Sequence, residues 1–336
     1  MKVVVVGAGL AGLVCATTLQ LRGYEVLVLE KSAGVGGRMA RRRISGTQVD
    51  HGAQYISPQG LDFRRFIQKM ESLGVVKPWV DQIYELTVSG LSAGDPDLIY
   101  PRYCGTTGMN AIAKYLAEGL SLWLRTMVVS ATYDVSKVQW QLTTEQGEVV
   151  LADRVVSAIP APQFLGIFGQ PLAELTDFIR AIRAVEFDAN LTVMAGYDSS
   201  LVVPSEWRAI RCVDHSVLGW IACDSSKYDL SPPTFVFQST AAFAEQYLED
   251  QDLAKQGRIL LDQVAQLLDA RLAQPQWWQV QRWRYSMARE FLGAACLVTR
   301  LPVPLVCAGD WCAGNNVEAA YKSGLAAATA IMDLND

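Results

Sequence analysis

The stretch VVVVGAGLAG, residues 3–12, decides the fold. Its four valines form a continuous β-branched run, which is typical of a strand buried on both faces in a parallel sheet. Residues 13–22 then carry apolar side chains at helical spacing and end at Gly23. Residues 25–30 form a second apolar run that finishes on an acid, Glu30. The order of strand, glycine turn, helix, strand and acid predicts a βαβ dinucleotide-binding unit.

Each part of this unit has a physical task. Gly7 makes the tight turn, Gly9 lets the backbone approach a pyrophosphate, and Gly12 lets helix and strand pack closely. The helix then begins at Leu10 and Ala11, where unpaired N–H groups and the positive end of the dipole face the phosphates. We assign these five residues to a bound dinucleotide.

The segment after the second strand indicates which dinucleotide is bound. Glu30 is placed to accept hydrogen bonds from ribose hydroxyls, and Lys31 follows it. Gly36 and Gly37 let the chain pass against a flat or phosphate-bearing ligand. Arg38 supplies a fork of donors for a pyrophosphate. We assign these residues and Met39 to the cofactor, whereas at least two of the three arginines at 41–43 are interpreted as a solvated basic turn.

The length and composition of the chain limit the class of protein to which it can belong. A chain of 336 residues exceeds a single compact core, so two joined lobes are expected. Half of the residues are apolar and the net charge is −5, which argues against a nucleic-acid partner. No apolar run reaches the roughly 18 residues of a membrane span, and the first strand begins at residue 3, so we expect a cytoplasmic protein. Seven scattered cysteines and two histidines indicate neither disulfides nor a metal site.

The motifs at both ends of the chain resemble the FAD-dependent amine oxidase superfamily. The resemblance is carried by the glycine fingerprint, Glu30, the run 36–38 and Ala308-Gly309-Asp310. DHGAQY at 50–55 and QRWRYS at 281–286 resemble its renalase branch more narrowly, although that branch often has histidine where Gln281 stands. The resemblance implies an α/β fold, in which a Rossmann-like (βαβ) FAD-binding lobe carries an inserted α+β substrate lobe built on a mixed sheet. It also implies non-covalent FAD.

The resemblance further implies domain limits and site residues. The FAD-binding domain is expected at 1–74, 101–160 and 287–336, and the substrate-binding domain at 75–100 and 161–286. Gly52, Ala53 and Gln54 are expected against the flavin ring, Val128 at the adenine, and Gly309 and Asp310 at the ribityl chain. The helix that begins with Val317, Glu318 and Ala319 is expected to point at the negative charge that hydride arrival leaves on the ring.

The expected reaction is hydride transfer to the flavin. The implied donor is a dihydronicotinamide, NAD(P)H or one of its isomers, and O2 is the expected acceptor. Gln54, Tyr55, Trp283 and Tyr285 are the candidate catalytic residues. Trp283 and Tyr285 share one face of a predicted strand and are expected in the pocket, whereas Arg282 and Arg284 take the other face.

Two alternatives stay open. The first is a flavin amine oxidase or desaturase acting on a small amine or apolar substrate, and the second is a flavin-free binding protein of the same fold. An amine must lose its proton before it donates hydride, and no lysine stands out as the base.

Asp214-His215-Ser216 contains the three residue types of a catalytic triad. Neighbouring side chains on the predicted strand point to opposite faces, however, so these three cannot act together as acid, base and nucleophile. Cys312 lacks the surroundings of a covalent flavin attachment.

Simple periodicity predicts the remaining elements. Helices are expected at 61–73, 105–120 with threonine caps, 246–273 and 317–332 behind Asn315 and Asn316, and strands or turns at 46–55, 75–100, 122–129, 138–142, 148–151, 154–160 and 303–308.

Overall fold

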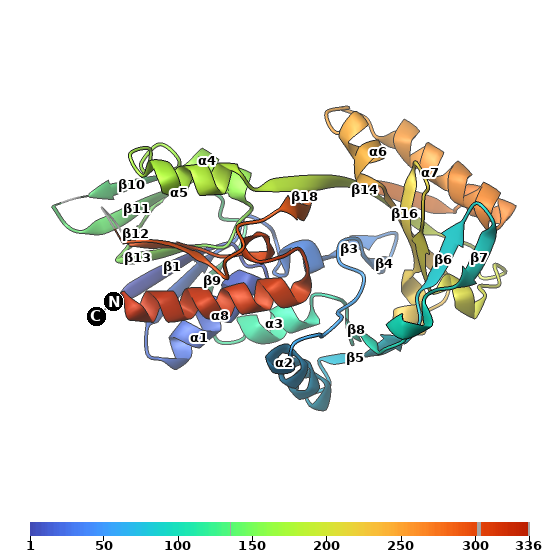
Figure 1. The fold of residues 1–336 in the computed structure, drawn as a ribbon, viewed down its shortest axis with the longest axis horizontal. Coiled ribbons are helices and arrows are strands. Elements are labelled where there is room, and N and C mark those ends of the chain that lie inside the picture. The colour runs from blue at the N-terminus through green and yellow to red at the C-terminus, as the bar shows by residue number, and fades with distance from the viewer. Residues whose placement is uncertain (135, 301–303, 335–336) are drawn as a thin grey trace.

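The computed structural model describes residues 1–134, 136–300 and 304–334, which form two lobes (Figure 1). The first lobe contains β1 (Lys2–Val6), α1 (Leu10–Leu21), β2 (Glu25–Leu29), η1 (Gly37–Met39), β3 (Arg41–Ile44), β4 (Thr47–Asp50), α2 (Leu61–Ser72), β5 (Val76–Val80), β8 (Arg102–Gly105), α3 (Ala111–Ala117), β9 (Ser121–Trp123), β10 (Val128–Asp134), β11 (Gln139–Thr144), β12 (Val149–Ala152), β13 (Arg154–Ser157), α4 (Ala161–Phe168), α5 (Thr176–Arg183), β19 (Leu297–Thr299), β20 (Leu305–Cys307), η6 (Asp310–Cys312) and α8 (Val317–Asp333). The second contains β6 (Tyr84–Thr87), β7 (Gly90–Ala93), η2 (Pro96–Leu98), β14 (Glu186–Gly196), η3 (Ser205–Trp207), β15 (Ala209–Cys212), β16 (Leu218–Cys223), η4 (Asp224–Lys227), β17 (Thr234–Ser239), α6 (Ala241–Gln246), α7 (Ala254–Leu267), η5 (Ala270–Ala273) and β18 (Trp277–Glu290).

The first lobe is a six-stranded sheet with helices on both faces. Its strand order is β19-β20-β13-β1-β2-β9, and β1 pairs in parallel with β2 and β13. Val3, Val4 and Val5 are fully buried because α1, α3 and α8 cover one face while α4, α5 and the small sheet β10–β12 cover the other (Figure 1). The prediction of a doubly covered parallel strand is confirmed.

The second lobe is a seven-stranded mixed sheet of order β18-β14-β17-β16-β15-β6-β7. Helices α6 and α7 pack on its outer face (Figure 1). Residues 75–100, which were expected to contribute to the second lobe, supply β6 and β7 at one edge of this sheet. The predicted domain limits stay predictions; β18 runs through the limit placed between residues 286 and 287.

Several element predictions are confirmed. Helix α2 ends at Ser72 and is followed by Gly74 in the left-handed region, at φ +71°. The hairpin β11–β12 and the strand β13 lie where periodicity placed them. Asn316 caps α8, because its side chain accepts from the N–H of Ala319 at 2.8 Å.

Three element predictions are wrong in part. The strand expected at 122–129 is two strands, β9 and β10, because Arg125 takes a positive φ of 55° between them. Of the helix expected at 246–273, only α7 and the short η5 are helical, since α6 already ends at Gln246. Helix α3 begins only at Ala111, and Thr106 donates to the carbonyl of Gly74 instead of capping it. The strand expected from Val303 is described only as β20, since 301–303 lie outside the described residues.

Candidate functional site

The glycine turn has the geometry that a bound pyrophosphate requires. Gly7 has a φ of +104°, and a Cβ on Gly12 would lie 2.1 Å from the Gly7 carbonyl oxygen, so both positions need glycine. A Cβ on Gly9, in contrast, would meet no described atom within 4 Å. Gly9 is the N-cap of α1 and supplies no side-chain cap, so the N–H groups of Leu10 and Ala11 begin the helix without a side-chain acceptor at the cap.

Glu30 is buried beside this turn. Its Oε2 accepts from the N–H of Ala8 and its Oε1 from the N–H of Ser32, both at 2.8 Å. Each carboxylate oxygen has a second lone pair, so both can still accept from a ribose. The Glu30 carbonyl accepts from the N–H of Thr126 at 2.9 Å. This contact brings the start of β10, and with it buried Val128, alongside the acid. Lys31 is exposed.

The paired glycines run beside the glycine turn. The N–H of Gly36 donates to the Ala8 carbonyl at 2.9 Å, and a Cβ on Gly37 would lie 3.4 Å from the Cα of Gly9. Arg38 follows, and its guanidinium forms a two-pronged ion pair with Asp310, one prong of which measures 2.8 Å. The structure therefore joins the two ends of the chain through the arginine assigned to the pyrophosphate and the aspartate assigned to the ribityl chain.

The segment 50–54 packs tightly against Arg38. A Cβ on Gly52 would lie 1.9 Å from the Arg38 carbonyl oxygen, and the N–H of Ala53 donates to that oxygen at 2.9 Å. The side chain of Gln54 turns inward, where its amide donates to the carbonyls of Asp50 at 2.7 Å and Gly52 at 3.0 Å. The Gln54 amide is thus already engaged by protein groups and holds the backbone of this segment.

A buried group of charges lies behind this segment. We call it the Asp50 cluster, and its members are Arg41, Asp50, Asp224, Lys227 and Tyr228. Lys227 is fully buried and its Nζ lies 2.9 Å from Asp224, 3.5 Å from Asp50 and 3.1 Å from the Gln54 oxygen. Arg41 Nε lies 3.1 Å from Asp50, and Tyr228 donates to the same carboxylate. The cluster therefore joins the first lobe to η4 of the second.

Burial and mutual attraction set the pKa values in this cluster. Burial raises the pKa of Asp224 to about 6, although the positive charge of Lys227 acts to lower it. For Lys227 burial alone would lower the pKa, but Asp224 and Asp50 outweigh it and the pKa is raised. Burial and Asp50 also raise the pKa of Tyr228. Lys227 thus stays charged, and its carboxylate partners are held in place by it.

His51 and Trp283 lie together on the other side of segment 50–54. Their ring centroids are 5.1 Å apart, and the Trp283 indole N–H donates to the His51 carbonyl at 2.9 Å. Burial, and then Arg42, lower the pKa of His51 to about 4, so the imidazole is neutral near pH 7. Arg42 donates to the side-chain carbonyl of Gln281, two residues from Trp283 on β18.

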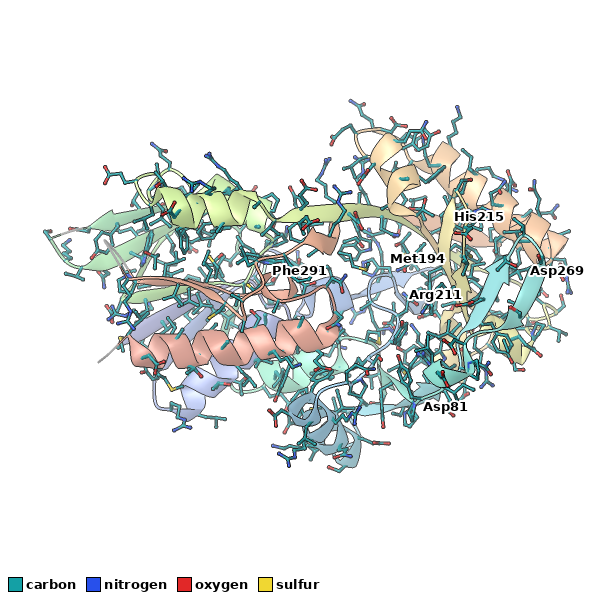
Figure 2. All side chains as sticks on the ribbon, in the orientation of Figure 1. Asp81, Met194, Arg211, His215, Asp269 and Phe291 are labelled. Atoms are coloured by element: carbon teal, nitrogen blue, oxygen red, sulfur yellow. The ribbon has the colours of Figure 1, made fainter. Side chains whose placement is uncertain are left out.

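The inner face of the second sheet, meaning the face toward β3 and β4, carries aromatic and amide side chains. The strand register places Trp283 opposite Asn190, Gln281 opposite Thr192, and Thr192 opposite Gln238. Gln238 reaches across to donate to the Gly52 carbonyl at 2.9 Å. Met194, on the same face, packs against Val49 of β4, and Figure 2 shows it between the lobes.

Tyr55 and Tyr285, the other aromatic candidates, do not contact the same residues as Trp283. The Tyr55 ring lies 5.6 Å from that of Trp220. Tyr285 packs on Phe187, at 5.6 Å, because the pairing of β18 with β14 becomes irregular just beyond Trp283. Trp283 and Tyr285 therefore have different neighbours, although a shared pocket was expected.

The two arginines beside them take the opposite side, as expected. Arg282 donates to the carbonyls of Leu248 and Asp250, and Arg284 pairs with Glu249.

Several other residues turn out to have structural partners. Glu318, expected at the flavin edge, accepts from the N–H groups of Gln59 at 2.7 Å and Gly60 at 3.0 Å, and so joins α8 to the start of α2. Burial raises the pKa of Cys312 to about 12, which keeps its thiol protonated. His215 lies in a turn instead of the expected strand, on the far side of the second sheet near α6 and α7 (Figure 2).

The interpretation of the arginine run as a solvated turn is wrong. The run 41–43 is the strand β3, and of its three side chains only Arg43 is exposed, because Arg41 pairs with Asp50 and Arg42 with Gln281. Sequence reasoning also missed Lys227. The available signal was DSSK, an acid and a lysine three residues apart after an apolar strand.

Taken together, the turn, Glu30, the paired glycines and segment 50–54 define a class: a two-lobed protein that holds an extended dinucleotide across a Rossmann-type lobe. The groups present fit FAD, because the backbone is open at Gly9, donors begin α1, and an acid stands at the end of β2. The chain matches the NAD(P)-binding Rossmann-like domain over residues 5–70 and the family of flavin containing amine oxidoreductases over residues 79–332. It belongs to that family.

Short segments of the chain are also similar in sequence to individual proteins. The chain is 41% identical over 68 residues to putrescine oxidase of Kocuria rosea and 47% identical over 51 residues to hydroxyneurosporene desaturase of Rubrivivax gelatinosus. These segments cover 20% and 15% of this chain and only 14% and 10% of the relatives. Most of each relative is therefore unmatched in sequence.

Solved structures match over the whole length. Putrescine oxidase bound to putrescine has a TM-score of 0.75 at 16% identity and covers 99% of both chains. Cyclohexylamine oxidase of Brevibacterium oxydans has a TM-score of 0.71 at 14% identity and covers 100% of both. At such identities the likeness shows the fold, and the expected α/β architecture is confirmed. The named relatives include amine oxidases and a desaturase.

Two absences concern the described residues alone. No helix in them is both long and apolar enough to cross a membrane. Nor do they bring three or more histidine, cysteine, aspartate or glutamate side chains together in a way that could hold a metal ion.

Proposed function

We propose that the protein is a FAD-dependent oxidase. It removes hydride from a carbon of a donor whose reacting group, a nitrogen-containing ring or an amine, is uncharged when it reacts. When bound, FAD would supply a flavin ring that can take up the hydride, with O2 as the final acceptor of the two electrons and hydrogen peroxide as the product. Residues of the glycine turn, Glu30, Gly36 and Gly37 would hold its adenosine and pyrophosphate. Gly52 and Ala53 would lie against the ring, and Asp310 near the ribityl chain. Burial of the Cys312 thiol supports non-covalent attachment.

The observation that carries the choice of donor is the charge around Trp283. The nearby carboxylates already have cationic partners: Asp50 and Asp224 have Lys227, Asp310 has Arg38, and Asp188 has Arg289 at 3.3 Å. Arg42 adds a positive charge, and His51 is neutral. An ammonium group beside Trp283 would therefore meet the positive charge of Arg42, and each of these four carboxylates is already paired with a cation.

Among the candidate donors, a dihydronicotinamide fits this arrangement of charges best. It is neutral at its ring, it becomes an aromatic cation on losing hydride, and it requires no protein base. The indole of Trp283 offers a flat face, and the amides of Asn190, Gln238 and Gln281 line the same sheet face as polar neighbours for a carboxamide. NAD(P)H or an isomer is accordingly our first candidate, in the manner of the renalase branch.

An amine or an apolar desaturase substrate is the second candidate, and the relatives are the observation that favours it. Putrescine oxidase and cyclohexylamine oxidase share the whole fold, and their names state amine donors. Lys227 does not supply the missing base, because its ammonium is fully buried and its pKa is raised. An amine would have to enter this site already neutral.

The deciding experiment is anaerobic mixing of the purified yellow protein with each donor. Dihydronicotinamide isomers, putrescine and cyclohexylamine are supplied separately, and loss of flavin absorbance near 450 nm is followed in stopped flow. We expect at least one dihydronicotinamide to bleach the flavin, and peroxide to form once air is admitted. Bleaching by amines alone would establish the second candidate. A purified protein that contains no flavin and takes up none would instead support the flavin-free binding protein.

A further inference from the structure

Arg42 differs from the other half-buried and buried cations near the site. Arg38, Arg41 and Lys227 each have a carboxylate partner within 4 Å. Arg42, in the described residues, has none within that distance, and its recorded side-chain partner is the neutral amide oxygen of Gln281. Its side chain is nevertheless partly buried, on β3. A guanidinium that has lost part of its hydration and faces only a neutral acceptor lacks charge compensation.

The position of Arg42 relates this cation to the donor site. Gln281 and Trp283 are two residues apart on β18 and so lie on the same face of the strand. His51 packs on Trp283, and the charge of Arg42 is felt at its imidazole, where it contributes to the lowered pKa. Arg42 therefore stands at the rim of the surface on which Trp283 presents its indole.

We propose that Arg42 recognises a phosphate group of the hydride donor. A guanidinium offers a planar fork of N–H donors that fits phosphate oxygens, and it keeps its charge at every relevant pH. Gln281 holds one N–H of the fork, which leaves the others to a ligand. The inference rests on the proposed function, and it adds the residue that distinguishes a phosphate-bearing donor from a free nicotinamide or its riboside.

The test uses two product analogues that differ only in phosphate: nicotinamide mononucleotide and nicotinamide riboside. Their Kd values are measured by titration calorimetry on the FAD-loaded protein, as wild type, Arg42→Gln, Arg42→Lys and Arg43→Gln. Arg43 is the matched control, since it is the next residue on β3, is exposed, and changes the net charge by the same amount. The FAD content of each variant is checked by absorbance.

We expect Arg42→Gln to weaken mononucleotide binding about tenfold, and riboside binding by less than about twofold. Arg42→Lys should retain part of the difference, because it keeps the charge and loses the fork. Arg43→Gln should change neither Kd. The preference for the mononucleotide should also shrink in high salt.

Three outcomes would overturn the inference. If Arg42→Gln weakens both compounds equally, the residue acts on the shape of the site and not on phosphate. If Arg43→Gln weakens mononucleotide binding as much as Arg42→Gln does, the effect comes from the net charge of the protein and not from a contact between Arg42 and the phosphate. If the wild type binds both compounds equally, or binds neither, the phosphate contact is wrong; the proposed donor class is judged separately, by whether a dihydronicotinamide bleaches the flavin.

Discussion

The glycine turn belongs to the first lobe alone, whereas the Asp50 cluster joins the two lobes, and they are built by opposite means. The turn uses three glycines within six residues, has no charge and leaves its backbone open at Gly9. The cluster draws charged groups from β3, β4 and η4, up to 186 residues apart, and buries Lys227 and both carboxylates completely. The turn is thus arranged to receive a ligand, whereas the cluster is arranged to hold the protein's own segments. Substitutions in the turn should affect the cofactor, and substitutions in the cluster should affect folding.

The largest expected effect comes from Lys227→Met. The change leaves Asp50 and Asp224 buried with too little positive charge, and we expect the free energy of unfolding to fall by about 3–5 kcal/mol. Urea unfolding of the apoprotein, followed by tryptophan fluorescence, measures it. Arg258→Met is the control, because it breaks an exposed pair with Asp262 and should cost less than about 1 kcal/mol. Equal losses in the two variants would remove the distinction between cluster and surface.

Gly12→Ala should come next. The new Cβ would lie 2.1 Å from the Gly7 carbonyl oxygen, which is backbone and cannot rotate away. We expect about 2–3 kcal/mol of destabilisation together with loss of bound flavin, measured by thermal unfolding and by absorbance. Gly34→Ala, at a position with nothing within 4 Å, should leave both readings unchanged.

His51 should give a smaller, pH-dependent effect. Its folded pKa of about 4 is below its ordinary value of 6.5, so the unfolded chain binds the extra proton first. Stability from this residue is complete above pH 6.5 and is lost as the pH falls toward 4. Between pH 7 and pH 5 we expect the wild type to lose about 2 kcal/mol more than His51→Gln. Parallel pH profiles for the two proteins would show that His51 charges freely in the folded state.

The smallest effect on stability is expected for Gly9→Ala. A Cβ there meets no described atom, so the free energy of unfolding of the apoprotein should change by less than about 1 kcal/mol. The same Cβ would occupy the space left for the pyrophosphate, and the Kd for FAD should rise by roughly tenfold or more. Fluorescence titration of the apoprotein with FAD measures it. A variant that binds FAD as tightly as the wild type would move the phosphates away from this turn.

The same contrast explains which features the sequence could predict. The βαβ unit was predictable because its strand, turn and helix follow from local periodicity and from glycines at fixed spacing. Lys227 was not, because its partner Asp50 lies 177 residues away and no local pattern pairs them. The segment 250–253 shows the opposite case, in which a local pattern predicts structure that does not form. Apolar spacing favoured a continuous helix, but Arg282 donates to the carbonyls of Leu248 and Asp250, and the chain is not helical there.

The site was predictable to a similar degree. Gly7 and Gly12 were predictable because the tight turn and the close packing of helix and strand require glycine there, and Glu30 directly follows β2, as the pattern indicated. The direction of the Gln54 and Glu318 side chains was not predictable, because each is set by a distant partner: Lys227 for the amide, and the start of α2 for the carboxylate.

The strand order of the first lobe has a consequence for synthesis in the cell. Strand β20 pairs with β13, and Asp310 closes on Arg38, so segments made late complete a sheet that β1 began. Until β20 leaves the ribosome, one edge of β13 stays without its neighbour and can pair wrongly. Chains that stop before β20 should therefore depend on chaperones, and flavin loading should begin only after β20 and Asp310 have been made.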